Sequence, residues 1–400
     1  MEKMWRRRKR IFLSDVRSPS YKYPKKLYRM SLQENDMQKE RISLSRRKKI
    51  LICAQAVDTQ DLALGFFVRW IEEFAKHHEH VSVICLKQGS FTLPKNVSVY
   101  SLGKEQSSRP RLFQRIRYGL RLYKYAWSLR REYDMVFVHM NQEYILAVGW
   151  LWALLGKKIY MWRNHYAGNS LTDIAAAFCT KIFCTSRHSY TARYKRSVLM
   201  PVGIDVETYH VIPGVARIPN SILWYARIAP SKRLKLFIET LGLLRSRGVS
   251  FSASVYGTPL PEDVEYYENI KSRAAALSIS DSVRFFSGVL HSEGPNIFSA
   301  HELFVNTSPG GMYDKTIFEA AMCRCIVLAS NQDFAGIAMS HLVFEEDNPV
   351  DLAGKIAKLL TLRSVEREEI TDSLKKIAER NNLTALGNAL IKEMQNASSV

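Results

Sequence analysis

The sequence predicts an α/β protein with two doubly wound parallel sheets, and three observations support this fold class. Short apolar runs typical of buried parallel strands alternate with segments of helical spacing from residue 49 onward. The alternation restarts after the segment 201–213, which we interpret as a hinge. The chain of 400 residues is also longer than one hydrophobic core usually organises. We therefore predict two domains, 49–203 and 204–380.

The first domain is expected to begin with a buried strand, because residues 50–54 are all apolar. The expected order is a strand at 49–54, a helix at 64–75, strands at 81–85 and 97–100, a helix at 111–131, a strand at 135–139, a helix that ends at 155, and strands at 158–162 and 181–184. The longest apolar stretch, 144–155, has 12 residues where a bilayer requires about 20, so we interpret it as a buried helix.

The second domain is expected to repeat the alternation of strands and helices. Its strand candidates are 221–225, 251–256, 283–286, 303–306, 325–329 and 342–344. From residue 352 to residue 394 the spacing is helical throughout. The last part, 381–400, is expected to form a helix that can cross back to the first domain.

The positive charge is concentrated at the start of the chain. Residues 1–49 hold 17 Lys+Arg against 5 Asp+Glu, or +12 of the net charge of +20. Because these residues show no sustained apolar period, we interpret 1–48 as a basic, disordered extension. A start codon assigned too far upstream is the alternative. Since the extension lacks the fold motif of a nucleic-acid reader, nucleic acid is not an expected partner.

The cysteines and the N-terminal composition favour a cytoplasmic location. The six cysteines are spread without the pairing of a zinc site, which favours reduced thiols. The basic start is followed by only three apolar residues, 11–13, so no secretory signal is expected.

Two cations follow the predicted strand 221–225. Arg227 and Lys232 are five residues apart across a Pro-Ser turn that leads into a helix near Arg233. Cations at the carboxyl end of a strand, beside a helix N-terminus, suit a diphosphate. The alternative is a solvated loop, in which single Arg and Lys residues are common.

A glycine turn follows the predicted strand 303–306. Gly310 and Gly311 permit positive φ and close approach of a ligand, and Asp314 or Thr316 could cap the next helix. Glu319, one turn further, could accept hydrogen bonds from ribose hydroxyls. The alternative is a surface carboxylate, which its apolar neighbours disfavour.

These segments together resemble a bacterial-type retaining glycosyltransferase of family 4 (glycosyl transferases group 1), which has the GT-B fold of two Rossmann-like domains. The resemblance covers roughly residues 49–395 and rests on five segments. They are PVGID at 201–205, YARIAPSKR at 225–233, VYG at 255–257, FFSG at 285–288 and FEAAMCRCIVLAS at 318–330. The resemblance implies that the two domains face a central cleft, where the first domain faces the acceptor and the second binds a nucleotide sugar.

The resemblance also implies roles for individual residues. Arg227 and Lys232 are expected to hold the donor diphosphate, and His165 is expected to lie near the transferred sugar. The expected donor-binding residues are Glu319, Gly311, Asp314, Lys315, Thr316, Gly257, Gly288 and Gly65.

One departure from the family pattern concerns the sugar pocket. The first glutamate of the family's Glu-x7-Glu pair would stand at position 311, where this chain has Gly311. Asp314 and Lys315 are the candidates to substitute for it. The Asp314 carboxylate could either cap the helix or turn towards the sugar.

The function expected from the resemblance is sugar transfer from a UDP-, GDP- or ADP-sugar, with retention, to a glycan, lipid-linked or small-molecule acceptor. No cofactor is expected, and no metal, since no Asp-x-Asp motif follows a strand. The alternative is a non-catalytic sugar-nucleotide-binding or scaffold protein on the same fold, because Gly311 replaces a carboxylate. No Gly-x-Gly-x-x-Gly follows the first strand, so an oxidoreductase is not expected.

The composition of the expected helix at 111–131 predicts a further partner, an anionic membrane surface. Phe113, Ile116, Leu120, Tyr123 and Trp127 recur at helical spacing, with basic residues among them. The alternative is that this stripe packs on the domain's own sheet. On the membrane interpretation, the protein is peripheral on the inner face of the membrane.

Overall fold

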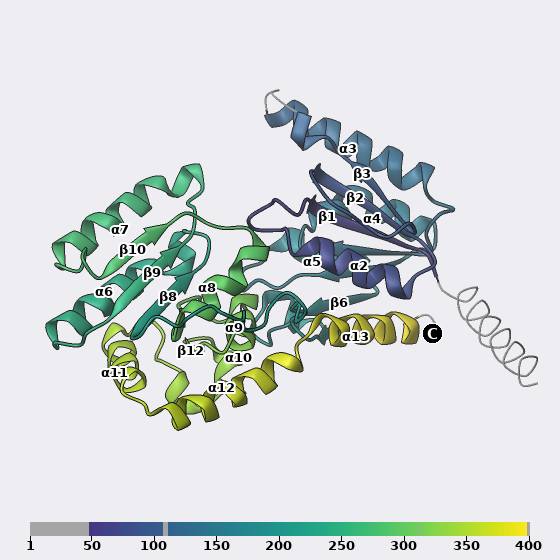
Figure 1. Cartoon of the computed structure of the whole chain (residues 1–400). Helices are drawn as coiled ribbons and strands as arrows, with labels where there is room; N and C mark the ends of the chain where they lie inside the picture. The colour runs from purple at the N-terminus through teal and green to yellow at the C-terminus, as the bar shows by residue number, and fades with distance from the viewer. Residues whose placement is uncertain (1–47, 107–110, 312, 398–400) are drawn as a thin grey trace, which may run out of the picture. The chain divides into compact units, whose positions relative to one another are not determined.

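The computed structural model describes residues 48–106, 111–311 and 313–397 (Figure 1). The predicted extension 1–48 lies outside these residues except for Lys48. Within the described residues the chain forms two parallel sheets, of seven and five strands. All six cysteines are buried and unpaired.

The first sheet has the order β3-β2-β1-β4-β5-β6-β7, with all neighbours parallel. Its strands are β1 (Ile50–Val57), β2 (Val81–Gln88), β3 (Val97–Ser101), β4 (Met135–His139), β5 (Lys158–Trp162), β6 (Lys181–Cys184) and β7 (Ser197–Leu199). The helices are α2 (Phe67–His77), α3 (Arg111–Ser128), α4 (Glu143–Leu154) and α5 (Ser170–Phe178), with short 3-10 turns at Lys104–Gln106 and Tyr190–Arg193. Because side chains alternate along each strand, α2 packs on one face of the sheet, and α3, α4 and α5 pack on the other.

The second sheet has the order β10-β9-β8-β11-β12, also all parallel. Its strands are β8 (Ser221–Tyr225), β9 (Ser252–Tyr256), β10 (Val283–Phe286), β11 (Leu303–Asn306) and β12 (Ile326–Ala329). Its helices are α6 (Leu234–Ser246), α7 (Val264–Ala276), α8 (Gly294–Ala300), α9 (Lys315–Met322), α10 (Gln332–Ala335), α11 (Pro349–Leu360) and α12 (Ser364–Glu379), followed by α13 (Leu383–Asn396). Short 3-10 turns lie at Pro230–Lys232, Pro261–Asp263, His291–Glu293 and Ser340–Leu342.

Six strands have the predicted bounds, namely β4, β5, β6, β8, β10 and β11. The predicted strand 342–344 is wrong, because a 3-10 turn ends at Leu342 and only Val343 bridges to Ala329. Leu342 and Phe344 are both buried, so their apolar pattern reflects packing against the core rather than a strand ladder.

The predicted continuous helix at 352–394 is interrupted twice, between α11 and α12 and between α12 and α13. The second interruption has a clear cause in the sequence. The Asn382 side chain accepts a hydrogen bond from the Ala385 backbone N–H at 2.7 Å and so starts a new helix.

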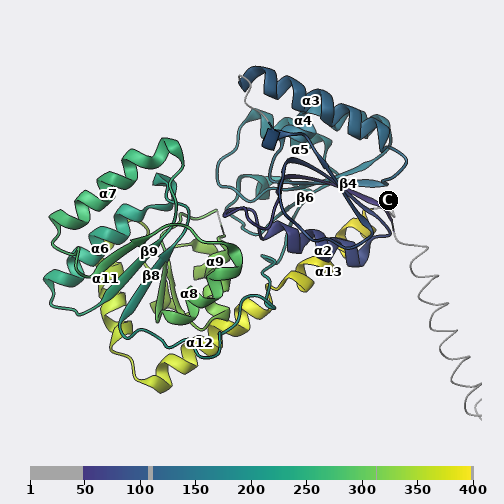
Figure 2. The ribbon, with the colours of Figure 1, turned by 45° about the horizontal axis from the view of Figure 1, so that its top comes forward.

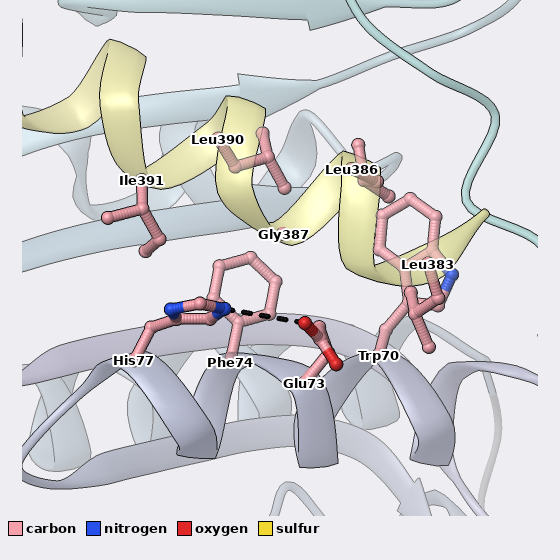
Figure 3. A pocket seen from close by; sticks show the side chains of 9 residues that line it. All are labelled: Trp70, Glu73, Phe74, His77, Leu383, Leu386, Gly387, Leu390 and Ile391. Carbon is pink, nitrogen blue, oxygen red and sulfur yellow. Dashed lines mark hydrogen bonds and ion pairs between the residues drawn. The ribbon is translucent and has the colours of Figure 1, made fainter. Parts of the chain in front are cut away.

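The last helix, α13, packs against α2 of the first sheet (Figure 3). Leu386 and Leu390 belong to the same buried cluster as Trp70 and Phe74. Gly387 allows the close approach, because a Cβ there would lie 2.8 Å from the Glu73 side chain. The helix α13 therefore packs on the first domain.

Candidate functional site

The candidate site lies where β8, β9, β10 and β11 end. Because parallel strands end at one edge of a sheet, the loops that follow them meet there. Since β8 lies between β9 and β11, the loop of Arg227 and Lys232 is adjacent to the loop of Gly311 and Asp314. The two loops that the sequence assigns to the donor thus come together.

Lys232 and Asp314 form an ion pair between these two loops. The Lys232 Nζ lies 2.8 Å from each carboxylate oxygen of Asp314. The same carboxylate accepts hydrogen bonds from the Ser308 hydroxyl at 2.5 Å and the Asn306 amide at 3.0 Å. Burial alone would raise the pKa of Asp314, but the Lys232 charge and these hydrogen bonds lower it below its ordinary value.

This pairing changes two expectations. Asp314 stands at the N-cap position of α9, yet its side chain accepts no backbone hydrogen bond there, so the predicted cap does not form. Thr316 does not cap the helix either, and its hydroxyl accepts a 3.5 Å hydrogen bond from Asn306. Lys232 has a structural partner, which the sequence did not predict.

Arg227 differs from Lys232 in its surroundings. Its side chain is exposed, and within the described residues no hydrogen bond or ion pair holds it. It follows β8 directly, two residues after Tyr225. An exposed guanidinium without a protein partner is available to a phosphate ligand.

Glu319 is buried in α9, with only 4% of its surface exposed. One carboxylate oxygen lies 3.5 Å from the His291 Nε2. The pKa of Tyr209 is raised, chiefly by burial and further by the negative charge of Glu319. The surface-carboxylate alternative is therefore wrong. His291 belongs to the 3-10 turn after β10, and the sequence analysis missed it.

The backbone explains why position 311 is a glycine. Gly311 has φ +81°, which L side chains rarely adopt. A Cβ there would lie 2.7 Å from the His188 carbonyl oxygen and 2.8 Å from the Tyr166 Cβ. A glutamate side chain at this position therefore has no room in this structure.

His165 belongs to the loop that follows β5, next to Tyr166. Its Nδ1 accepts a hydrogen bond from the Ala167 N–H at 2.9 Å, and its ring stacks on Tyr166 at 4.6 Å. Burial lowers the pKa of His165, and the charges of Arg163 and Lys232 lower it further. The structure thus brings His165 within the electrostatic reach of Lys232.

The remaining predicted glycines lie where backbones approach closely. A Cβ on Gly257 would lie 2.1 Å from the Ala226 carbonyl oxygen, so no side chain fits there. The Gly288 N–H donates to the Thr258 hydroxyl at 2.9 Å. A Cβ on Gly65 would lie 2.8 Å from the Asp61 carbonyl oxygen. These three glycines shape loops rather than offering side-chain chemistry.

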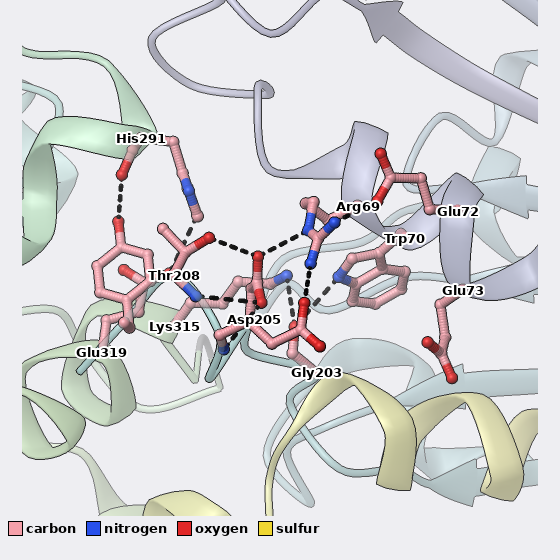
Figure 4. A network of polar contacts seen from close by, with 12 residues as sticks. Arg69, Trp70, Glu72, Glu73, Gly203, Asp205, Thr208, His291, Lys315 and Glu319 are labelled. Carbon is pink, nitrogen blue, oxygen red and sulfur yellow. Dashed lines mark hydrogen bonds and ion pairs between the residues drawn. The ribbon is translucent and has the colours of Figure 1, made fainter. Parts of the chain in front are cut away.

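The Lys315 side chain does not join the Lys232–Asp314 pair but extends towards the hinge (Figure 4). Its Nζ donates to the Gly203 carbonyl at 3.1 Å and lies 3.8 Å and 4.3 Å from the ring centroids of Phe66 and Trp70. Burial lowers the pKa of Lys315 to about 7. Lys315 therefore joins α9 to the hinge segment and to α2.

A second polar link between the hinge and α2 centres on Asp205 (Figure 4). Its carboxylate accepts hydrogen bonds from the Arg69 Nε at 2.8 Å and the Thr208 hydroxyl at 2.7 Å. Burial alone would raise the pKa of Asp205, but these hydrogen bonds hold it below its ordinary value. The sequence did not predict this link.

A row of aromatic side chains at the ends of three strands was not predicted from the sequence. Tyr225, Tyr256 and Phe286 are the last residues of β8, β9 and β10 and lie in register. The rings of Tyr256 and Phe286 stack at 4.5 Å. The signal was present, since an aromatic residue precedes each turn in YAR, YG and FSG.

Among residues 48–106, 111–311 and 313–397, no group of three or more His, Cys, Asp or Glu side chains is placed to hold a metal ion. In the same residues, no helix is both long and apolar enough to cross a bilayer.

Comparisons with known proteins agree with this architecture. Residues 205–380 match the family described as Glycosyl transferases group 1. No curated protein matches the chain. Anabaena Alr3699/HepE, solved with UDP and glucose, is 16% identical, with a TM-score of 0.69 over 87% of this chain and 100% of that chain.

Two further solved structures are similar. Sucrose-phosphate synthase from Thermosynechococcus elongatus is 13% identical, with a TM-score of 0.69 over 88% of this chain and 100% of that chain. WaaG, a glycosyltransferase involved in lipopolysaccharide biosynthesis, is 16% identical, with a TM-score of 0.59 over 85% of this chain and 98% of that chain. The predicted fold class is confirmed. Residues 205–380 are a glycosyl transferases group 1 domain, within a chain that has the GT-B fold of two Rossmann-like domains.

Proposed function

We propose that this protein transfers a sugar from a nucleotide diphosphate sugar to an acceptor. The observation that carries the proposal is the exposed guanidinium of Arg227, which has no partner among the described residues and shares its loop with Lys232, at the strand edge where open α/β sheets bind ligands. The similarity to HepE, which was solved with UDP and glucose, supports a donor of this class.

In this proposal the second domain binds the donor. Arg227 and Lys232 hold the diphosphate, and the buried Glu319 accepts hydrogen bonds from ribose. As the sugar leaves, negative charge grows on the diphosphate, and positive charge beside it stabilises the departing group. In this proposal Arg227 supplies the uncompensated positive charge, since Asp314 balances the charge of Lys232, and no metal ion is proposed to take part.

In this proposal the first domain supplies His165 and binds the acceptor. His165 is neutral near pH 7, since its pKa is lowered, so it can exchange hydrogen bonds with sugar hydroxyls. The acceptor is a glycan, a lipid-linked sugar or a small molecule, and the similarity to WaaG supports the first two. Retention and membership of family 4 remain what the sequence resemblance implies.

One observation favours a second candidate, a non-catalytic sugar-nucleotide-binding protein. Position 311 has no room for a carboxylate, and Asp314 is engaged by Lys232 rather than directed to a sugar. Binding without transfer is the outcome expected from this candidate.

A panel of UDP-, GDP- and ADP-sugars tests both candidates. A donor at 100 times its dissociation constant stabilises the folded protein by about 2.7 kcal/mol, which thermal shift detects. The stabilising donor is then incubated with and without EDTA, and released nucleoside diphosphate is measured. Release that survives EDTA supports the proposal, and stabilisation without any release supports the second candidate. No stabilisation by any member of the panel contradicts both.

A further inference from the structure

The helix α3 presents a row of large apolar side chains to solvent. Phe113, Ile116, Leu120, Tyr123 and Trp127 are all exposed, Phe113 to 65% and Leu120 to 69%. The buried face of α3 is a different one, which includes Leu122 and Ala126. The alternative that the row packs on the domain's own sheet is therefore wrong.

The neighbouring helix α4 extends this row. Trp150 is exposed and its ring stacks on Tyr123 at 6.1 Å, and Leu154 is 78% exposed. The helices α3 and α4 lie side by side on the same face of the first sheet (Figure 2). We call these seven exposed residues of α3 and α4 the α3–α4 face.

Basic residues accompany the α3–α4 face. The α3 sequence contains five Lys or Arg residues and no Asp or Glu. Helical spacing places Arg117, Arg121 and Lys124 along one side of the apolar row. Arg121 is held there by a 2.9 Å hydrogen bond to the Leu102 carbonyl, and Lys124 is exposed. The surface is therefore apolar in the middle and positive along its edge.

We propose that the α3–α4 face docks on an anionic lipid bilayer. A helix with exposed apolar residues and flanking cations lies in the plane of a membrane interface, with its apolar side chains in the acyl boundary. Tyr and Trp, here Tyr123, Trp127 and Trp150, are the residues that such interfaces favour. The cations along the edge of the face select an anionic bilayer as its occupant, because a leaflet of anionic lipids presents an extended negative surface.

The charge of the whole chain adds to this attraction. Residues 1–49 contribute +12, which is the same sign as α3. Cations near an anionic leaflet strengthen binding over about one Debye length. Neutral vesicles should consequently bind more weakly than anionic ones, and salt should weaken the binding.

Co-sedimentation of the full chain tests the proposal, using vesicles of phosphatidylcholine with and without phosphatidylglycerol. The variant Phe113→Ser/Leu120→Ser removes two large apolar side chains that are mostly exposed. We expect it to bind anionic vesicles at least about tenfold more weakly. The control Val350→Ser/Val365→Ser changes two exposed valines on α11 and α12 and should bind like the wild type.

A charge variant, Arg117→Glu/Lys124→Glu, separates attraction from insertion. It should weaken binding to anionic vesicles and leave the residual binding to neutral vesicles unchanged. Thermal melting checks that each variant is folded. The binding assay contains no donor, so its outcome is independent of the proposed transferase activity.

Two results would overturn the proposal. One is wild-type vesicle binding by the Phe113→Ser/Leu120→Ser variant, which would assign any membrane binding to another part of the chain. The other is a wild-type dimer that this variant converts to a monomer without any loss of vesicle binding. That result would show that a second copy covers the α3–α4 face.

Discussion

Replacing Asp314 by asparagine should destabilise the protein, because Asp314 balances the charge of Lys232. The Lys232 Nζ is 2.8 Å from both carboxylate oxygens, and only 16% and 19% of the two side chains are exposed. In the variant, the amide keeps the shape of the carboxylate but leaves the lysine charge without compensation.

The magnitude follows from this burial. Breaking a fully buried ion pair costs about 3–5 kcal/mol, and exposed pairs contribute about 0–1 kcal/mol. Since both side chains retain some exposure, we expect a loss of about 2–3 kcal/mol in the free energy of unfolding. For a domain of this size, that corresponds to a fall in Tm of about 4–12 °C.

Urea and thermal denaturation of a double-mutant cycle measure this loss. The cycle comprises Asp314→Asn, Lys232→Met and the double variant, and it should give a coupling energy of about 1–3 kcal/mol. The control is Asp281→Asn, which breaks the exposed pair with Arg245 and should change stability by less than about 1 kcal/mol. A wild-type Tm for Asp314→Asn, or purely additive effects in the cycle, would refute the reasoning.

Two further predictions concern α9 and the loop before it. Gly311→Ala should lower Tm by several degrees, because a residue with a side chain at φ +81° costs about 1–2 kcal/mol and its Cβ would lie 2.7 Å from the His188 carbonyl oxygen. The matched control is Gly310→Ala, whose Cβ would have no neighbouring atom closer than 3.7 Å. Equal melting of the two variants would contradict the geometry. Burial lowers the pKa of Lys315 from 10.5 to about 7 in the folded protein. Between these two pH values the unfolded chain therefore binds more protons than the folded chain. The free energy of unfolding of the wild type, relative to that of Lys315→Met, should consequently rise with pH from about 7 towards 10. A difference in unfolding free energy that stays constant over this range would show that Lys315 keeps an ordinary pKa in the folded protein.

The sequence was sufficient to predict the strands of both sheets except β7, which was missed, and 342–344, which was wrongly expected, and it predicted the edge that carries the candidate site. Strands such as 158–162 and 303–306 are short apolar runs between turn residues, and local composition defines their ends. Arg227 and Lys232 were assigned to that edge because they directly follow a strand, which topology then places beside the loop of Gly311.

The sequence was not sufficient to predict contacts between distant segments. Asp314 was expected either to cap α9 or to turn towards the sugar, whereas a lysine 82 residues away in the chain engages its carboxylate. Lys315 was grouped with Asp314 for the same local reason, although it bonds to Gly203. The conflict between a side chain at position 311 and the His188 carbonyl likewise exists only once both domains are folded.

The central claim is that Arg227 and Lys232 bind the diphosphate of the donor, and calorimetric titration of Arg227→Ala tests it most directly. The titrants are the nucleoside diphosphate that gives the largest thermal shift and its parent nucleoside. Since charged hydrogen bonds contribute about 1.5–3 kcal/mol, we predict a 10- to 100-fold weaker affinity for the diphosphate and no change for the nucleoside. Arg284→Ala, which removes an exposed arginine of β10, should bind both titrants like the wild type. Wild-type affinity of Arg227→Ala for the diphosphate, or an equal loss for the nucleoside, would contradict the claim.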